Sequence, residues 1–136
     1  MVLPDGQEFL HARASTAAAM TAGYLYETNS IIAGTGYEKA LTCVAAVGAT
    51  SVVVTAPAGT GMTKDQYADG YLFVASSTGT GVGLKYKVVA NNSTAAGSTS
   101  TVSLDPADPI KVAIGGTTAT LGLRNNKYDG LIVAEA

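Results

Sequence analysis

The sequence predicts an all-β protein, folded as a single compact sandwich or barrel-like domain of about eight or nine short strands with an extended N-terminal arm. Three observations lead to this prediction. From Gly23 onward, β-branched and aromatic runs alternate with Gly, Asn, Asp and Ser, which is the spacing of short strands joined by turns. The length of 136 residues suits one core and no second one. The single cysteine, Cys43, excludes an intrachain disulfide framework.

The N-terminal part has the weakest strand pattern. Residues 1–29 are predicted to form the arm and a first strand, and residues 30–136 a β-domain. Residues 3–6 have turn chemistry, because proline presets φ and glycine accepts a positive φ. An extended piece over residues 7–14 follows, and the alanine-rich residues 15–22 begin with helix-capping residue types and predict a short helical turn.

The remaining elements are predicted from alternation and flanking breakers. The clearest strand places Leu84, Tyr86 and Val88 on one face, and Lys85 and Lys87 on the other, in solvent or against a partner. The same alternation assigns four further side chains to the core, Val102, Leu104, Leu121 and Leu123. The predicted strands are residues 23–28, 37–46, 51–56, 71–76, 84–90, 99–104, 110–114, 118–124 and 130–134.

Residues 40–62 carry no charge over 23 residues, which is the length of a membrane span. Threonine, serine, glycine and proline interrupt their apolar residues, so two strands joined at residues 48–50 are favoured over a helix. We therefore expect no membrane partner.

Charged residues make up only 13% of the chain, about half of the usual share of roughly 25%. The polar share lies instead in Thr, Ser, Gly and Asn, which predicts a neutral, hydroxyl-rich surface suited to close packing against neighbours. The net charge is −2 with no basic block, so no nucleic-acid partner is expected. The first ten residues lack the basic start and apolar run of a secretion signal.

No group of residues has the pattern of a catalytic or metal site. His11 is the only histidine, and a polar role on the arm is favoured over a general base. Cys43 alternates with apolar residues and is interpreted as a buried side chain. The glycine-rich residues 59–64 and 79–83 lack the spacing of a phosphate-binding loop. We therefore expect no enzymatic activity, no cofactor and no metal.

Two other kinds of site were considered, a calcium site formed by aspartates and a sugar site or protein interface formed by tyrosines. The aspartates do not follow a calcium-loop spacing, and a role in turns is favoured over calcium binding for Asp65, Asp69, Asp105 and Asp108. Three tyrosines, Tyr37, Tyr71 and Tyr86, lie in or beside predicted strands and are assigned to the core or its boundary. A protein interface or a sugar site is the alternative to a core position for Tyr24, Tyr26, Tyr67 and Tyr128.

Segments spread over most of the chain carry a resemblance to a known family. They are residues 3–9 (LPDGQEF), 22–26 (AGYLY), 65–74 (DQYADGYLFV), 79–88 (GTGVGLKYKV), 102–106 (VSLDP) and 125–130 (NNKYDG). In this order they resemble the small capsid decoration, or cement, proteins of tailed bacteriophages. The resemblance implies a β-rich module, commonly a homotrimer, that sits on the outside of the head and bridges capsomers of the major capsid protein. It brings no catalytic residue and no site motif.

The expected function is therefore that of a non-enzymatic virion structural protein, made in the host cytoplasm and carried on the capsid exterior. The arm is expected to reach onto the capsid or a sister subunit, by adding a strand to an exposed edge. Deleting residues 1–14 should then abolish particle binding and leave the β-domain folded. The expected interface residues are Leu3, Phe9, Leu10, His11, Arg13, Tyr24, Tyr26 and Tyr128.

The alternative is a receptor- or carbohydrate-binding β-module of a fibre or surface assembly. Its shallow pocket would use tyrosines and hydrogen-bonding side chains, namely Tyr67, Tyr71 or Tyr128 with Asn91, Asn92 or Asp129. An enzyme ranks third because no catalytic constellation is found. A tail-tube subunit is a further alternative, which ring or tube formation by the isolated chain would reveal.

Overall fold

The computed structural model describes residues 13–14, 20–24, 26–27, 41–56, 59, 61–76, 81–115, 120–126 and 128–133. Within these residues every regular element is a β-strand and none is a helix, so the predicted all-β class is confirmed. The helical turn predicted over residues 15–22 lies mostly outside the described residues, and residues 22–23 form a turn. Most of the predicted arm also lies outside the described residues.

The chain divides into two compact units, Ile32–Asn126 and a unit made of Met1–Ile31 with Lys127–Ala136. The sequence assigned residues 127–136 to the β-domain, whereas the structure groups them with the N-terminal residues. The pairing of strands far apart in the sequence accounts for this difference, because local alternation does not specify a strand's partner.

The smaller unit contains a three-stranded sheet in which the C-terminal strand lies between two N-terminal strands. Its strands are β1 (Arg13–Ala14), β2 (Tyr26–Glu27) and β9 (Asp129–Val133). β9 pairs parallel with β1 and antiparallel with β2, with Arg13 opposite Asp129 and Tyr26 opposite Val133. The strands predicted over residues 23–28 and 130–134 thus contain β2 and most of β9, and residues 23–24 lie before β2.

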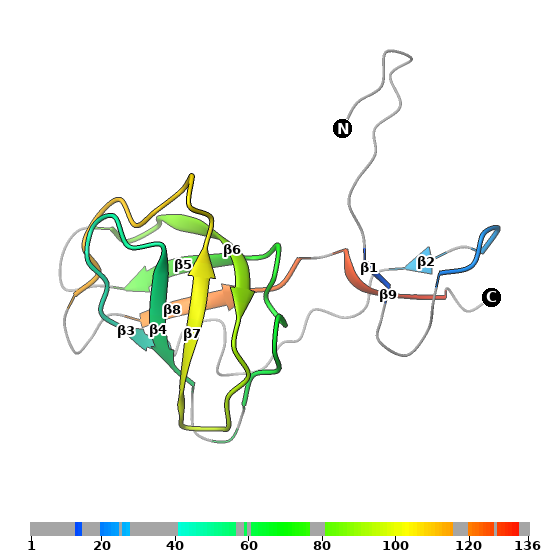
Figure 1. Ribbon diagram of the computed structural model, residues 1–136, viewed down its shortest axis with the longest axis horizontal. Coiled ribbons are helices and arrows are strands. Elements are labelled where there is room, and N and C mark those ends of the chain that lie inside the picture. The colour runs from blue at the N-terminus through cyan, green and yellow to red at the C-terminus, as the bar shows by residue number, and fades with distance from the viewer. Residues whose placement is uncertain are drawn as a thin grey trace, which may run out of the picture. The chain divides into compact units, whose positions relative to one another are not determined.

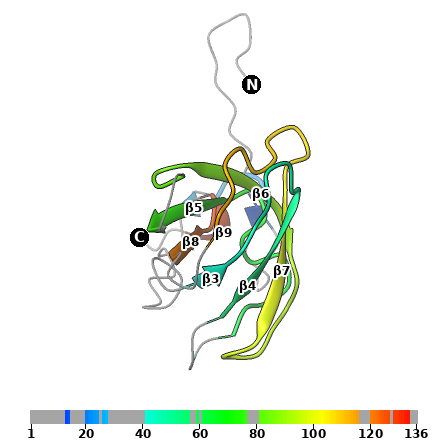
Figure 2. The ribbon, with the colours of Figure 1, turned by 90° about the vertical axis from the view of Figure 1, so that its left-hand side faces the viewer.

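The larger unit is a closed, six-stranded antiparallel barrel, with the order β3-β4-β7-β6-β5-β8 (Figure 1). Its strands are β3 (Leu41–Cys43), β4 (Ser51–Thr55), β5 (Tyr71–Ser76), β6 (Lys85–Asn91), β7 (Thr99–Leu104) and β8 (Thr120–Arg124). In Figure 2, β4 and β7 lie on one side of the barrel and β5 and β8 on the other. The sequence left sandwich and barrel open, and the structure selects the barrel.

The core follows the period of two in these strands. Alternate residues of β4, β6 and β7 point inward, as in the buried Val52 and Val54 of β4. The predicted core positions are confirmed for Tyr86, Val88, Val102, Leu104, Leu121 and Leu123, all nearly inaccessible. Leu84 is only partly buried, because β6 begins after it, and it packs against the edge of the core.

The strand predicted over residues 110–114 is wrong. This segment is irregular and is hydrogen-bonded to the β3–β4 connection at its two ends only. Ile110 exchanges backbone hydrogen bonds with Gly48 and Ala49, and Ile114 with Ala45, at 2.8–3.0 Å. Both isoleucine side chains are buried, so the apolar alternation arose from two separate core contacts rather than from a continuous ladder.

The uncharged residues 40–62 contain β3 and β4 with a turn between them, which confirms two strands there. No helix long and apolar enough to cross a membrane occurs in the part of the chain that the structure describes.

Candidate functional site

The outside of the barrel presents two chemically different surfaces. On β3, β4 and β7 the outward-facing side chains carry hydroxyl or methyl groups and no charge. This surface, here called the hydroxyl face, consists of Thr42, Ser51, Val53, Thr55, Thr99, Thr101 and Ser103. Because the three strands are neighbours, these residues form one continuous uncharged area.

Strand register brings the hydroxyl face together in rows. Thr55 of β4 lies opposite Thr42 of β3 and Thr99 of β7. The next rows pair Val53 with Thr101 and Ser51 with Ser103. Such rows of β-branched and small residues pack closely across strands. The residues therefore contribute to sheet stability and to the surface chemistry at the same time.

Two valines on or beside the hydroxyl face are largely exposed. Val53 has 55% of its surface accessible, and Val44, which directly follows β3, has 76%. An apolar side chain without a charged neighbour on its face can be covered by another protein at little desolvation cost. The hydroxyl face is therefore suited to contact with another surface rather than to chemistry.

The second surface lies over β5, β6 and β8 and contains a hollow of about 400 Å³, here called the aromatic hollow. The described residues that line it are Tyr71, Phe73, Lys85 and Arg124. Register places Arg124 opposite Tyr71 and Lys85 opposite Phe73. Opposite Phe73 on the other side is Gly122, which contributes no side chain.

Lys85 and Tyr71 are in contact in this hollow. The Lys85 ammonium nitrogen lies 5.3 Å from the centre of the Tyr71 ring, within the range of a cation–π interaction. Tyr71 is 46% exposed, so ring and cation are both presented to solvent. The predicted outward orientation of Lys85 and Lys87 is confirmed, since both side chains are exposed.

Two residues considered for a sugar pocket are interior instead. Tyr67 is 2% exposed and belongs to the core, and Asn91 is equally buried. The Asn91 Oδ1 accepts a hydrogen bond from the Tyr67 backbone N–H at 2.9 Å, and its Nδ2 donates to the Thr63 carbonyl at 2.8 Å. The alternative role of Tyr67 and Asn91 in a surface pocket is therefore wrong, because both side chains are buried where residues 63–70 pack against β6. Asn92, one residue further on, is exposed.

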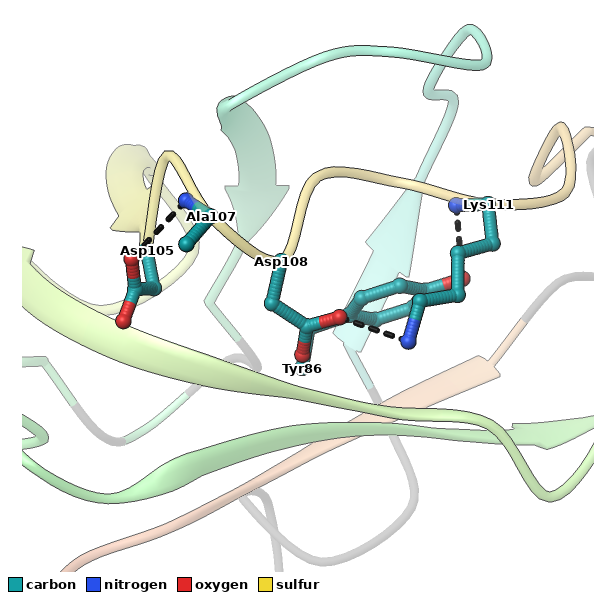
Figure 3. Close-up of polar contacts among 5 residues, drawn as sticks. All are labelled: Tyr86, Asp105, Ala107, Asp108 and Lys111. Carbon is teal, nitrogen blue, oxygen red and sulfur yellow. Dashed lines mark hydrogen bonds and ion pairs between the residues drawn. The ribbon is translucent and has the colours of Figure 1, made fainter.

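The four aspartates considered for calcium binding lie in turns or directly beside them. Asp105 Oδ1 accepts a hydrogen bond from the Ala107 N–H at 2.9 Å, which confirms the predicted turn (Figure 3). Asp108 pairs with Lys111, with 2.7 Å between Oδ1 and Nζ (Figure 3). This hydrogen bond and the Asp108 charge raise the pKa of the exposed Lys111 ammonium.

Asp65 and Asp69 both adopt positive φ, at 57° and 60°. Aspartate tolerates this conformation better than most residues, and it fits the turns over residues 63–70. Within the described ranges, no three His, Cys, Asp or Glu side chains gather in a way that could hold a metal ion.

Tyr86 and Cys43 are core residues with a polar atom. The Tyr86 hydroxyl accepts a hydrogen bond from the Lys111 backbone N–H at 3.2 Å, so its polar end is satisfied although the side chain is inaccessible. Burial raises the pKa of the Cys43 thiol to about 11. The predicted buried position of Cys43 is therefore confirmed, and its thiol has little nucleophilic thiolate at neutral pH.

The residues expected at an interface all belong to the smaller unit. Leu3, Phe9, Leu10 and His11 lie outside the described residues. Arg13 lies in β1, and Tyr24 is exposed in the turn before β2. Tyr26 is half-buried, and its hydroxyl bonds the backbone of Thr21, while Tyr128 is half-buried just before β9. Their role at an interface stays a prediction.

Comparison with protein-family models, with curated proteins and with solved structures found no match for this chain. The sequence considered Tyr71 for a sugar pocket and predicted a hydroxyl-rich surface, but it did not identify the hydroxyl face or the aromatic hollow. The outward lysines of β6 and the excess of Thr and Ser are the sequence signals by which these two surfaces could have been found.

Proposed function

We propose that this protein is a non-enzymatic virion structural protein that decorates the outside of a tailed-phage capsid and stabilises it by bridging capsomers of the major capsid protein. The observation that carries the proposal is the hydroxyl face, which is uncharged across three neighbouring strands. The order of segments resembling the decoration proteins supports the same function.

An uncharged contact of this kind obtains its free energy from buried area. Apolar surface contributes roughly 25 cal/mol per Å² removed from water, much of which is offset by the entropy lost on association. Several identical contacts made at once by an oligomer convert weak binding into stable attachment. A homotrimer that engages several capsid subunits together is therefore part of the proposal, as are synthesis in the host cytoplasm and a final location on the capsid exterior.

The direct test measures the mass of the purified chain in solution and its co-sedimentation with undecorated phage heads. A stable trimer that saturates the heads and raises their rupture temperature is expected. A monomer that fails to bind at any concentration tested would overturn the proposal. Rings or tubes formed by the isolated chain would support a tail-tube subunit instead.

The contribution of the arm is tested by a shorter truncation than the sequence suggested. Because Arg13–Ala14 form β1 and pair with β9, removing them would also disturb the sheet of the smaller unit. Deletion of residues 1–12 keeps β1. Loss of head binding with unchanged circular dichroism is expected, and unchanged binding would show that residues 1–12 are not part of the interface.

A carbohydrate-binding module is the second candidate function. The observation that favours it is the aromatic hollow, where exposed Tyr71 lies beside Lys85. Aromatic rings with a few polar or charged groups are typical of small-ligand sites.

A further inference from the structure

The aromatic hollow combines two kinds of binding group in a small space. The rings of Tyr71 and Phe73 offer apolar surface, and Lys85 and Arg124 offer positive charge. None of the lining residues that the structure describes is acidic. A complementary ligand therefore has an apolar face and an anionic group close to each other.

The position of the hollow on the sheet excludes one mode of ligand binding, the addition of a peptide strand. It lies on the outer face of β5, which is hydrogen-bonded to β6 on one side and to β8 on the other. An extended peptide cannot add to a strand whose two edges are already paired. Recognition at this place must use the ring faces and the charged groups, not backbone hydrogen bonds to β5.

Size and charge argue against a long polyanion. A volume of about 400 Å³ falls at the small end of the roughly 300–1,000 Å³ usual for ligand pockets. Residues 32–126 contain six basic and five acidic side chains, so the unit has a net charge of only +1. Nucleic acid is held by extended rows of cations, which this unit lacks.

We infer that the aromatic hollow binds an acidic sugar, a single hexuronic-acid ring at the end of or within a glycan. The ring packs its apolar C–H face against the side chains of Tyr71 and Phe73, and its carboxylate accepts a hydrogen bond from Lys85. Ammonium groups form strong charge-assisted hydrogen bonds with carboxylates. This binding does not depend on the proposed capsid attachment, and either can fail without the other.

The test uses the full chain, labelled with ¹⁵N, and follows backbone amide shifts by NMR. The probe is methyl β-D-glucuronide, and methyl β-D-glucoside is the matched neutral sugar. Saturable shifts on β5, β6 and β8 are expected with the glucuronide. The glucoside should bind about tenfold more weakly or worse, because it lacks the carboxylate.

Substituted variants distinguish binding in the aromatic hollow from non-specific attraction of the glucuronide to surface lysines. Lys85→Gln and Tyr71→Ala should each weaken glucuronide binding about tenfold. Lys87→Gln is the matched control, since Lys87 lies two residues along β6 on the same exposed face but does not line the hollow. Its binding should equal that of the unsubstituted chain. All three positions are exposed, and unchanged spectra away from the substituted residue verify the fold.

Several outcomes would overturn the inference. They are no saturable shift with the glucuronide, equal affinity for both sugars, or an equal effect of Lys85→Gln and Lys87→Gln. Tighter binding of hexaglutamate or of a short oligothymidylate than of the glucuronide would also overturn it, and would assign the hollow to an acidic peptide or a single strand.

Discussion

Asn91 and Tyr67 are 24 residues apart in the sequence and joined by a buried hydrogen bond of 2.9 Å, from the Tyr67 backbone N–H to the Asn91 Oδ1. The Asn91 Nδ2 donates in turn to the carbonyls of Thr63 and Asn92 at 2.8 and 3.0 Å. One side chain thus satisfies three backbone groups, two of which belong to residues 63–70. Strand β6 and residues 63–70 are thereby held together.

Asn91→Ala should lower the free energy of unfolding by about 1–3 kcal/mol, because it leaves the Tyr67 N–H without its side-chain acceptor in a buried place. Urea unfolding followed by circular dichroism measures the change. Asn92→Ala is the matched control, since Asn92 is exposed and only its backbone is hydrogen-bonded. It should change the free energy by less than about 0.5 kcal/mol. Equal losses in both variants would contradict the structural role of Asn91.

Gly70→Ala should also destabilise the barrel, by about 1–3 kcal/mol. A Cβ at this position would collide with the Arg124 carbonyl oxygen and lie 3.0 Å from the Asn125 Cα, and backbone atoms cannot easily move away. Gly115→Ala is the control, because a Cβ there meets nothing within 4 Å and φ is not positive. The measurement is the midpoint of thermal or urea unfolding. A tolerated Gly70→Ala would mean that β8 does not approach Gly70 closely.

Tyr86→Phe should cost about 0.5–1.5 kcal/mol, because the Lys111 backbone N–H loses the hydroxyl that accepts its hydrogen bond. Tyr71→Phe removes a hydroxyl from a half-exposed ring and should be close to neutral. Urea unfolding of both variants gives the comparison. An equal effect of the two substitutions would argue against the bond between Tyr86 and Lys111.

Cys43 should be unreactive toward a thiol reagent such as Ellman's reagent in the folded protein at pH 8, and reactive after unfolding. Burial raises its pKa from 9.0 to about 11, so the folded state keeps the proton that the unfolded state releases. The contribution of the protonated Cys43 thiol to the free energy of unfolding is present below pH 9, and it is lost as the pH rises from about 9 to about 11. Cys43→Ala should lose less stability than the unsubstituted chain over this range. Parallel pH profiles would contradict the prediction.

Val53→Lys should weaken binding to undecorated heads about tenfold or more, because it places a charge in the middle of the hydroxyl face, where the contact would bury it. Val82→Lys is the matched control, since Val82 is similarly exposed, at 56%, but lies in a turn outside that face. Co-sedimentation measures binding, and circular dichroism verifies that both variants fold. If Val82→Lys weakens binding as much as Val53→Lys, the hydroxyl face is not the contact surface.

The sites themselves were only partly predictable. Alternation along β6 correctly placed Lys85 and Lys87 outside, and composition predicted an uncharged, hydroxyl-rich surface. Tyr71 was assigned to the core or its boundary, but its meeting with Arg124 depends on the register between β5 and β8. The core position of Tyr67 is confirmed over the alternative surface position. The interior position of Asn91 was missed, because the predicted strand ended at residue 90 whereas β6 extends to Asn91.

By itself, the sequence determined the all-β class, the inward side of most strands and the hydroxyl-rich, charge-poor composition from which the hydroxyl face is built. These features are local, since side chains along a strand alternate with a period of two whatever the strand pairs with. Only the tertiary structure decided that β4 pairs with β7, that the barrel closes between β3 and β8, and that β9 lies between β1 and β2. Such pairings join residues far apart in the chain, and their free energy depends on the whole set of side chains buried together, which no short segment encodes.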